Sequence, residues 1–335
     1  MSARPAGAGL ACASVAYVDA AAQAWFSRRT SRDADWPADK LLAAKSDTRV
    51  TVVLPALNEQ ATVGRIVRSI RRELVDRLGL VDELVVVDSG STDATIDRAA
   101  EAGADVVRRE DVLPDLPVRP GKGEVLWRSL AATTGDVVAF IDSDISDFTP
   151  TFVTGLLGPL LTDPSVQFVK ATYDRPLQSG ETLLPTGGGR VTELVARPLL
   201  ALHWPQLSGF VQPLGGEYAA RRDLLESLPF PCGYGVEFGL LVDTYAAVGL
   251  DAMAQVDLSR RKHRNQDLPK LGRMAVEILQ VAEARLGREV ATPVVLSQFR
   301  RGAGGYDVID SDMTELERPP MRHARTSNVT SPLPE

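Results

Sequence analysis

Short apolar runs alternate with longer segments of helical periodicity through the first half of the chain. The runs have the length and composition of buried parallel strands, and they lie at residues 50–55, 83–88, 105–108, 136–142 and 166–171. Apolar residues at every third or fourth position predict helices between them, at residues 59–78, 92–102 and 123–133. This alternation over residues 49–172 predicts an α/β fold with a Rossmann-like, doubly wound and mostly parallel sheet.

The second half of the chain has a less regular pattern. Residues 173–189 are rich in Pro and Gly and lack periodicity, which predicts a mobile loop or lid. Helix and strand patterns then resume at residues 191–202, 235–248, 253–258 and 268–286, and they predict an α+β region that packs against the first half.

The two ends of the chain differ in composition from the rest. Residues 1–18 imitate a secretory signal but have a weak apolar core, so a mobile extension is the better interpretation. From Arg301 onwards, glycines, prolines and polar residues predict a flexible tail. The predicted parts are a partly disordered N-terminal extension (1–45), a nucleotide-binding region (46–172), a lid loop with a further binding region (173–300) and the tail (301–335).

Composition narrows the class of protein. The chain has 335 residues, of which 44% are hydrophobic and 24% charged, as in a globular protein with a sizeable core. A net charge of −7 argues against nucleic-acid binding, which needs a basic face. Only Cys12 and Cys232 are present, which suits a reducing cytoplasm. No apolar stretch is long enough for membrane insertion.

The run from Val137 to Asp144 predicts a buried strand that ends in two carboxylates, Asp142 and Asp144. Residues two apart in an extended chain point the same way, so both acids face the crevice at the carboxyl end of the sheet. Mg²⁺ and Mn²⁺ take one or two such carboxylates and complete their shell with phosphate oxygens and water. An acidic pair alone is weak evidence, since most such pairs are merely solvated.

Two further strand-to-helix turns strengthen this interpretation. One is Leu54–Glu59, and the other is Val87–Asp93, where a glycine turn precedes the helix. Either could be only a favourable turn. Because the carboxyl ends of neighbouring parallel strands meet in one crevice, the three turns together could hold a base, a ribose and a metal-bound diphosphate.

Other candidate residues lie outside these turns. The glycines before Arg190 and the helix predicted from Val191 could form an anion site with Thr192, or the glycines could be a hinge. Lys122 lies in a glycine-flanked segment and could reach a pocket or remain on the surface. His263 lies in a run of basic residues, and a histidine in such a run is usually a surface residue. The neighbouring cations also disfavour protonation of the imidazole, however, and a neutral imidazole can bind a metal.

The motifs LPALNE, VVDSGSTD and FIDSDI resemble those of the GT-A glycosyltransferases, which bind nucleotide sugars. The later segments GGGRVTEL, GYGVE and RKHRNQ are most similar to glucosyl-3-phosphoglycerate synthases, a retaining actinobacterial family. The resemblance spans residues 45–290. Ser89 stands where the general family has a second acid, which departs from the general pattern and agrees with the synthases.

The resemblance implies roles for individual residues. The donor UDP-glucose would contact twelve residues: Pro55, Ala56, Leu57, Asn58, Glu59, Ser89, Lys122, Asp142, Ser143, Tyr234, Glu237 and Arg261. The acceptor would contact Gly189, Arg190, Val191, Thr192 and Asn265. Asp144 and His263 would bind the metal, and Asp144, Glu237 and Arg261 would act in catalysis.

The resemblance therefore predicts a metal-dependent glycosyltransferase that uses Mg²⁺ or Mn²⁺ and moves glucose from UDP-glucose to 3-phosphoglycerate with retention of configuration. In that family the reaction is the first step toward glucosylglycerate and methylglucose lipopolysaccharide, and the enzymes are cytoplasmic homodimers. Two alternatives remain open from the sequence. One is an inverting transferase that acts on a polyprenyl phosphate, and the other is a nucleotide-sugar sensor without turnover.

Overall fold

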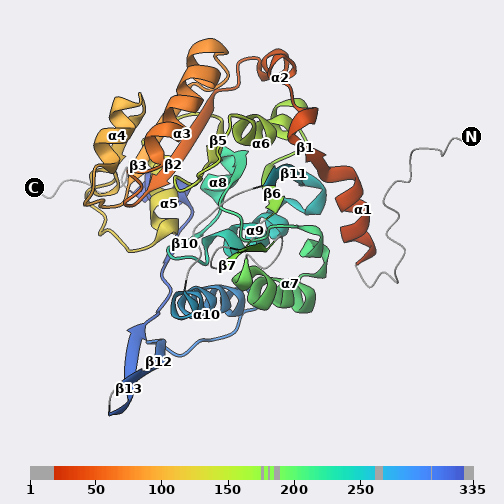
Figure 1. Ribbon diagram of the computed structural model, residues 1–335. Helices are drawn as coiled ribbons and strands as arrows, with labels where there is room; N and C mark the ends of the chain where they lie inside the picture. The colour runs from red at the N-terminus through yellow and green to blue at the C-terminus, as the bar shows by residue number, and fades with distance from the viewer. Residues whose placement is uncertain are drawn as a thin grey trace, which may run out of the picture.

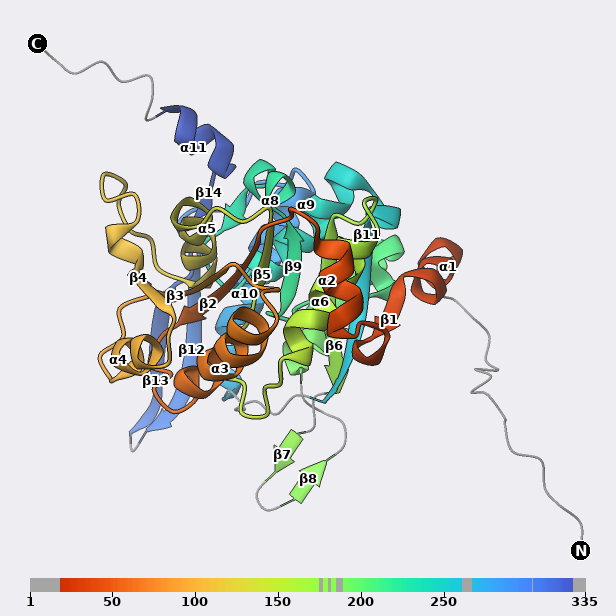
Figure 2. The same cartoon turned by 90° about the horizontal axis from the view of Figure 1, so that it is seen from above.

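A computed structural model describes residues 19–174, 177–179, 182–184, 189–260, 267–302 and 304–327 (Figures 1 and 2). Its centre is an eight-stranded sheet in the order β1-β11-β6-β9-β5-β2-β3-β4. Strand β9 runs antiparallel to both its neighbours, β5 and β6. The other neighbouring pairs of this sheet are parallel, so the predicted α/β fold with a mostly parallel sheet is confirmed.

The strands of the central sheet are β1 (Thr30–Arg32), β2 (Val50–Ala56), β3 (Glu83–Asp88), β4 (Asp105–Arg108), β5 (Val137–Phe140), β6 (Phe168–Asp174), β9 (Tyr218–Arg221) and β11 (Met253–Arg260). Three small two-stranded sheets pair β7 (Leu177–Ser179) with β8 (Thr182–Leu184), β10 (Phe230–Pro231) with β14 (Glu317–Arg318), and β12 (Val295–Gly302) with β13 (Gly305–Asp312). The five strands predicted in the first half therefore correspond to β2 to β6.

The α-helices are α1 (Ala20–Arg29), α2 (Ala38–Lys45), α3 (Val63–Ile70), α4 (Thr95–Glu101), α5 (Lys122–Ala132), α6 (Thr151–Thr162), α7 (Arg197–His203), α8 (Arg222–Ser227), α9 (Val236–Val248), α10 (Leu268–Arg285) and α11 (Met321–Ser327). Shorter 3₁₀ or π turns are η1 (Asp33–Asp35), η2 (Arg71–Arg77), η3 (Arg109–Asp111), η4 (Thr192–Ala196), η5 (Pro205–Gly209) and η6 (Leu250–Ala252). Each described helix is too short or too polar to cross a membrane.

Both faces of the sheet are covered by helices, as the continuous apolar character of the strands requires. Val52 and Leu54 of β2 contribute to one hydrophobic core, which includes residues of α3 and α6. Val53, between them in sequence, points into a second core with Trp127 of α5 and Phe238 of α9. The two-residue period of the strands thus divides the interior into two layers of core.

Residues 19–45, which the sequence analysis assigned to an extension, form α1, β1 and α2. Strand β1 adds a parallel edge to the sheet beside β11. Trp25 of α1 is fully buried, and its indole Nε1 donates a hydrogen bond to the carbonyl of Met253 at 2.8 Å. A buried indole that finds a hydrogen-bond partner anchors this segment to the fold.

Helix α6 was not predicted from the sequence. It contains Gly155, Gly158 and Pro159, which are poor helix formers. The structure gives a packing reason for two of them, because a side chain at Gly155 would meet Leu258 at 2.9 Å and one at Gly158 would collide with the ring of Trp36. Tertiary packing therefore overrides the local preference at this helix.

Part of the segment predicted as a flexible tail forms secondary structure. Strand β13 pairs with β12 in a hairpin that Figure 1 shows extending from the body near α10. Strand β14 pairs with β10. The guanidinium Nε of Arg318 donates a hydrogen bond to the buried carboxylate of Glu124 at 2.7 Å. The sequence could not predict this contact, because nothing near Arg318 in the sequence indicates a buried partner.

Candidate active site

A cavity of about 350 Å³ opens at the carboxyl ends of β2, β3 and β5. This is the crevice where the sequence predicted a nucleotide site. Its lining comprises Pro55, Ala56, Leu57, Glu59, Ser89, Arg109, Gly121, Lys122, Val125, Asp142, Ser143, Asp144 and Tyr234. The structure therefore brings most of the predicted donor residues together in one concave site.

The β2–α3 and β3–α4 turns are locked to each other by hydrogen bonds. The Ser89 hydroxyl and the Ser89 amide both donate to the Ala56 carbonyl, each at 2.9 Å. Asn58 adopts a left-handed backbone with φ of 57°, and its side-chain oxygen accepts from the Thr92 amide at 2.9 Å. Asn58 therefore fixes the turn, whereas its neighbours Leu57 and Glu59 line the cavity.

Lys122 links two carboxylates at one end of the cavity. Its Nζ lies 2.6 Å from Oδ1 of Asp142 and 2.8 Å from Oε1 of Glu237. Burial by itself lowers the pKa of Lys122, but the attraction of the two carboxylates outweighs it and raises this pKa well above its ordinary value. Lys122 is therefore a permanent cation that joins the β5 end of the site to α9.

Because Gly216 has no side chain, it leaves room for the ion pair between Lys122 and Asp142. A Cβ atom at Gly216 would lie 2.5 Å from Nζ of Lys122 and 2.6 Å from Oδ1 of Asp142. Gly216 directly precedes Glu217 and β9, the antiparallel strand beside β5. The chain entering β9 therefore needs a glycine at this position to leave room for Lys122 and Asp142.

Asp144 lines the same cavity, and the residue between it and Asp142 is held in place. The Ser143 hydroxyl donates to the Pro55 carbonyl at 2.8 Å, which ties the end of β5 to β2. The described residues contain no group of three or more metal-ligating side chains. A single carboxylate at this cavity fits Mg²⁺ or Mn²⁺, because these ions take one or two carboxylates and complete their shell with phosphate oxygens of a ligand and water.

Three predicted site residues, Arg261, His263 and Asn265, lie outside the described residues, so their roles stay predictions. The predicted acceptor residues from Gly189 to Thr192 lie at the start of η4. Gly189 has φ of 72°, a backbone conformation that favours glycine, and its carbonyl accepts from the Glu193 amide at 3.0 Å. Val191 and Thr192 are buried, which places these two side chains against the core.

The cavity includes residues that the sequence analysis missed, among them Arg109. Arg109 follows β4, and its buried Nε has no hydrogen-bond partner within the described residues. No local motif distinguishes it from the adjacent Arg108. Only the parallel pairing of β4 with β3 brings this arginine beside Ser89 at the cavity.

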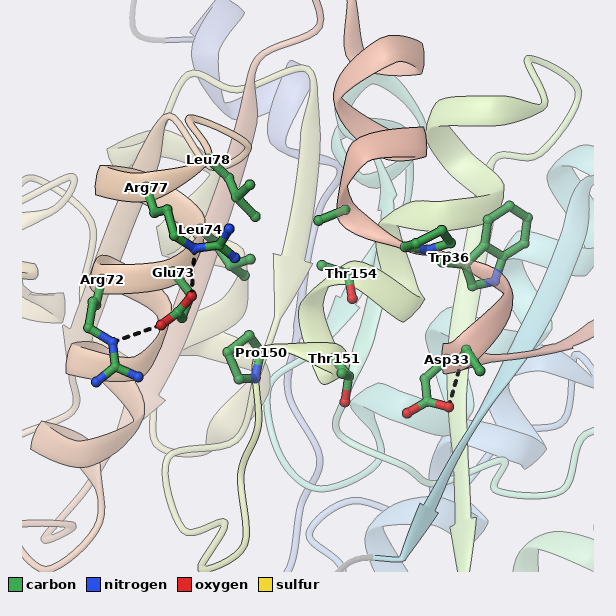
Figure 3. Close-up of a pocket in the computed structure, with 13 residues that line it drawn as sticks. Asp33, Trp36, Arg72, Glu73, Leu74, Arg77, Leu78, Pro150, Thr151 and Thr154 are labelled. Carbon is green, nitrogen blue, oxygen red and sulfur yellow. Dashed lines mark hydrogen bonds and ion pairs between the residues drawn. The ribbon is translucent and has the colours of Figure 1, made fainter.

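A second hollow, of about 650 Å³, lies between η1, η2 and the start of α6 (Figure 3). It shares none of the lining residues of the donor cavity. Three of its charged groups already pair with one another, since Arg72 and Arg77 both bind Glu73 at 2.8 Å. The smaller cavity is the better candidate for an active site because polar groups from several strands converge there.

The fold and the convergent strand ends define a nucleotide-sugar glycosyltransferase. The model of the glycosyl transferase family 2 matches residues 51–200, which contain all three motifs of the donor cavity. A curated glucosyl-3-phosphoglycerate synthase from Mycobacterium tuberculosis is 54% identical over 300 residues, which cover 87% of this chain and 90% of the relative. This chain belongs to the glucosyl-3-phosphoglycerate synthase family.

Solved structures agree with this assignment. A crystal structure of the M. tuberculosis synthase with Mn²⁺, UDP-glucose and phosphoglyceric acid has a TM-score of 0.77 at 51% identity, covering 87% of this chain and 96% of that one. Another, with Mg²⁺ and UDP, has a TM-score of 0.80 at 51% identity, covering 89% of this chain and 99% of that one. The predicted glycosyltransferase family is thus confirmed.

Proposed function

We propose that this protein transfers glucose from UDP-glucose to 3-phosphoglycerate with the help of Mg²⁺ or Mn²⁺, and that it releases UDP and glucosyl-3-phosphoglycerate. The observation that carries this proposal is the convergence of three family motifs on one cavity in a chain 54% identical to a curated synthase. The same similarity favours the synthase over the polyprenyl-phosphate transferase and over the sensor.

The donor would bind along the carboxyl ends of the strands. Ser89, Pro55 and the β2–α3 turn would hold the uridine, with Arg109 beside Ser89 as an additional contact. Asp142 and Lys122 would contact the ribose and base. Glu237, at the other end of the Lys122 bridge, would accept hydrogen bonds from glucose hydroxyls.

The chemical step breaks the bond between the anomeric carbon and the diphosphate, and it forms a bond from that carbon to the hydroxyl of the acceptor. The metal held by Asp144 and His263 would offset the negative charge that develops on the leaving diphosphate. Arg261 would also face the diphosphate, while Gly189, Arg190, Thr192 and Asn265 would hold the acceptor. We infer front-face attack with retention, in which the leaving diphosphate takes the acceptor proton.

We expect release of UDP from UDP-glucose to require both 3-phosphoglycerate and Mg²⁺. The reason is that the leaving group departs only when its charge is offset and the acceptor is aligned. A coupled assay of UDP, with and without acceptor and with glycerol or phosphate as control acceptors, measures this. If UDP-glucose binds saturably but no UDP is released in the presence of 3-phosphoglycerate, the result would argue instead for a sensor.

We also propose that the protein is a cytoplasmic homodimer. Support for the dimer comes from the β12–β13 hairpin, where Phe299 and Val308 oppose each other and are 68% and 57% exposed. A two-stranded hairpin with exposed apolar side chains is marginally stable alone and is typical of an interface. The low cysteine content supports a cytoplasmic location, because disulfide-rich proteins are typical of oxidising compartments.

The variant Phe299→Glu combined with Val308→Glu should convert the dimer to a monomer, because two like charges at the centre of an apolar interface lose their water and, facing each other, cannot pair. Light scattering after gel filtration measures the mass. Phe26→Glu, at another exposed apolar residue, serves as the control and should leave the mass unchanged. A double variant that keeps the wild-type dimer mass would show that the hairpin is not part of the dimer interface.

A further inference from the structure

The segment Cys232–Gly235 connects β10 to α9 and forms one wall of the donor cavity. Tyr234 in this segment lines the cavity. Glu237 lies in the first turn of α9, and its carboxylate binds Lys122 at 2.8 Å. The position of this short loop therefore determines where Tyr234 and Glu237 lie relative to the donor.

Two carboxylates from distant parts of the chain bind the backbone of this loop. Glu277 of α10 accepts from the Tyr234 amide at 2.5 Å, and Glu315, between β13 and β14, accepts from the Gly233 amide at 2.8 Å. The Cys232 amide also donates to the Leu316 carbonyl at 2.7 Å. Three successive amides of the loop are thus held from outside the donor cavity.

The contact between the two carboxylates and the loop backbone is so close that it requires glycine in the loop. A Cβ atom at Gly233 would lie 2.7 Å from Oε2 of Glu315 and would also collide with the Glu277 carboxylate. A Cβ atom at Gly235 would lie 2.6 Å from Val281 of α10. The absence of a side chain at Gly233 therefore lets both carboxylates reach the loop, and its absence at Gly235 lets α10 pack against the loop.

The two carboxylates share a small hollow of about 160 Å³ beside the loop, next to Asp312 of β13. Burial raises the pKa of Glu315 to about 7, and the charge of Glu277 adds to the effect. Burial likewise raises the pKa of Glu277, with the negative charge of Glu237 contributing. Arg119 does not line the hollow, and it acts on the neighbouring Cys232 thiol, whose pKa it lowers against the effect of burial. Repulsion between the carboxylates therefore increases as pH rises.

We propose that Glu277 and Glu315 are positioning residues that hold the Gly233 and Tyr234 amides and so place Tyr234 and Glu237 against the donor sugar. The nucleotide half of the site rests on β2, β3 and β5 and does not depend on them. The inference rests on the proposed function, because it assigns the sugar half of the donor to this wall. Neither residue touches the reacting atoms.

The test compares Glu315→Leu with Glu315→Gln, whose amide oxygen can still accept from Gly233. Glu315→Leu should lower kcat for UDP-glucose and 3-phosphoglycerate by about 10²-fold, since a displacement of about 1 Å can have that effect. Its Kd for UDP with Mg²⁺, measured by calorimetry, should stay within about 2-fold of wild type. Glu315→Gln should restore most of kcat, and Glu289→Leu, at an exposed glutamate, is the matched control.

A second readout keeps the test independent of catalysis and of how well the leucine variant folds. The folded pKa of Glu315 is raised, so the stabilisation it provides is present in acid and is lost as pH rises through about 7. Protection of the Gly233 and Tyr234 amides against hydrogen exchange, corrected for intrinsic rates, should fall between about pH 5 and pH 7 in the wild type. Glu315→Gln should remove this fall.

Each outcome decides one claim. Equal protection in wild type and Glu315→Gln at both pH values overturns the inference, and so does a Glu315→Leu variant with wild-type kcat. A loss of UDP affinity that matches the loss of kcat would indicate a general structural role and would also overturn it. If the wild type releases no UDP with the acceptor, the proposed function fails, while the exchange measurement still tests whether Glu277 and Glu315 hold the Gly233 and Tyr234 amides.

Discussion

Asp144→Asn should lower the rate of UDP release in the presence of 3-phosphoglycerate by at least about 10³-fold, because it removes the carboxylate that would hold the metal at the leaving diphosphate. Asn keeps the size of the side chain, so the fold should be preserved. The Mg²⁺ concentration needed for half-maximal activity should rise as well. An activity assay over a titration of Mg²⁺ measures both effects.

The control is Asp223→Asn, which makes the same substitution at an exposed residue on α8. It should leave the rate and the Mg²⁺ requirement unchanged. If Asp144→Asn kept a wild-type rate and an unchanged Mg²⁺ requirement, the metal site would have to lie elsewhere. Circular dichroism of both variants excludes a loss of fold as the cause.

Lys122→Met should cost about 3 kcal/mol of stability and lower the rate of transfer by about 10²-fold. The variant leaves the carboxylates of Asp142 and Glu237 without their shared cation in a site where Glu237 is only 5% exposed. An uncompensated buried charge is strongly destabilising. Urea unfolding gives the free energy, and the UDP assay gives the rate.

Arg28→Met is the control, because Arg28 is also ion-paired, with Asp251 at 2.8 Å, but its side chain is 59% exposed and lies outside the cavity. It should cost at most about 1 kcal/mol and leave the rate unchanged. Lys122→Arg should recover stability better than activity, since the guanidinium keeps the charge but alters the geometry. Unchanged stability and rate in Lys122→Met would contradict the bridging role of this lysine.

The sequence predicted which strand ends converge at the cavity because its signals there are local. The strand before Asp142 and Asp144 is a continuous apolar run, the turn after β2 carries Asn58, and the turn after β3 carries glycine and capping residues. Parallel topology then requires those ends to converge. The fold class and the place of the cavity followed from these elements.

The rest of the site depends on contacts between distant segments. Strand β9 enters antiparallel between β5 and β6, and this pairing brings Gly216 against Lys122 and Asp142. Arg109 reaches the cavity only through the pairing of β4 with β3. The segment with Glu315 has the composition of a tail, yet it binds the loop before α9. No local periodicity encodes these long-range pairings.

The central claim is best tested by NMR of the product made from UDP-glucose labelled with ¹³C in glucose, together with 3-phosphoglycerate and Mg²⁺. We predict one labelled product in which glucose is joined to the hydroxyl of 3-phosphoglycerate through an α-glycosidic bond. A β-linked product would contradict retention of configuration. Labelled glucose that remains entirely in UDP-glucose or appears as free glucose would contradict the proposed transfer itself.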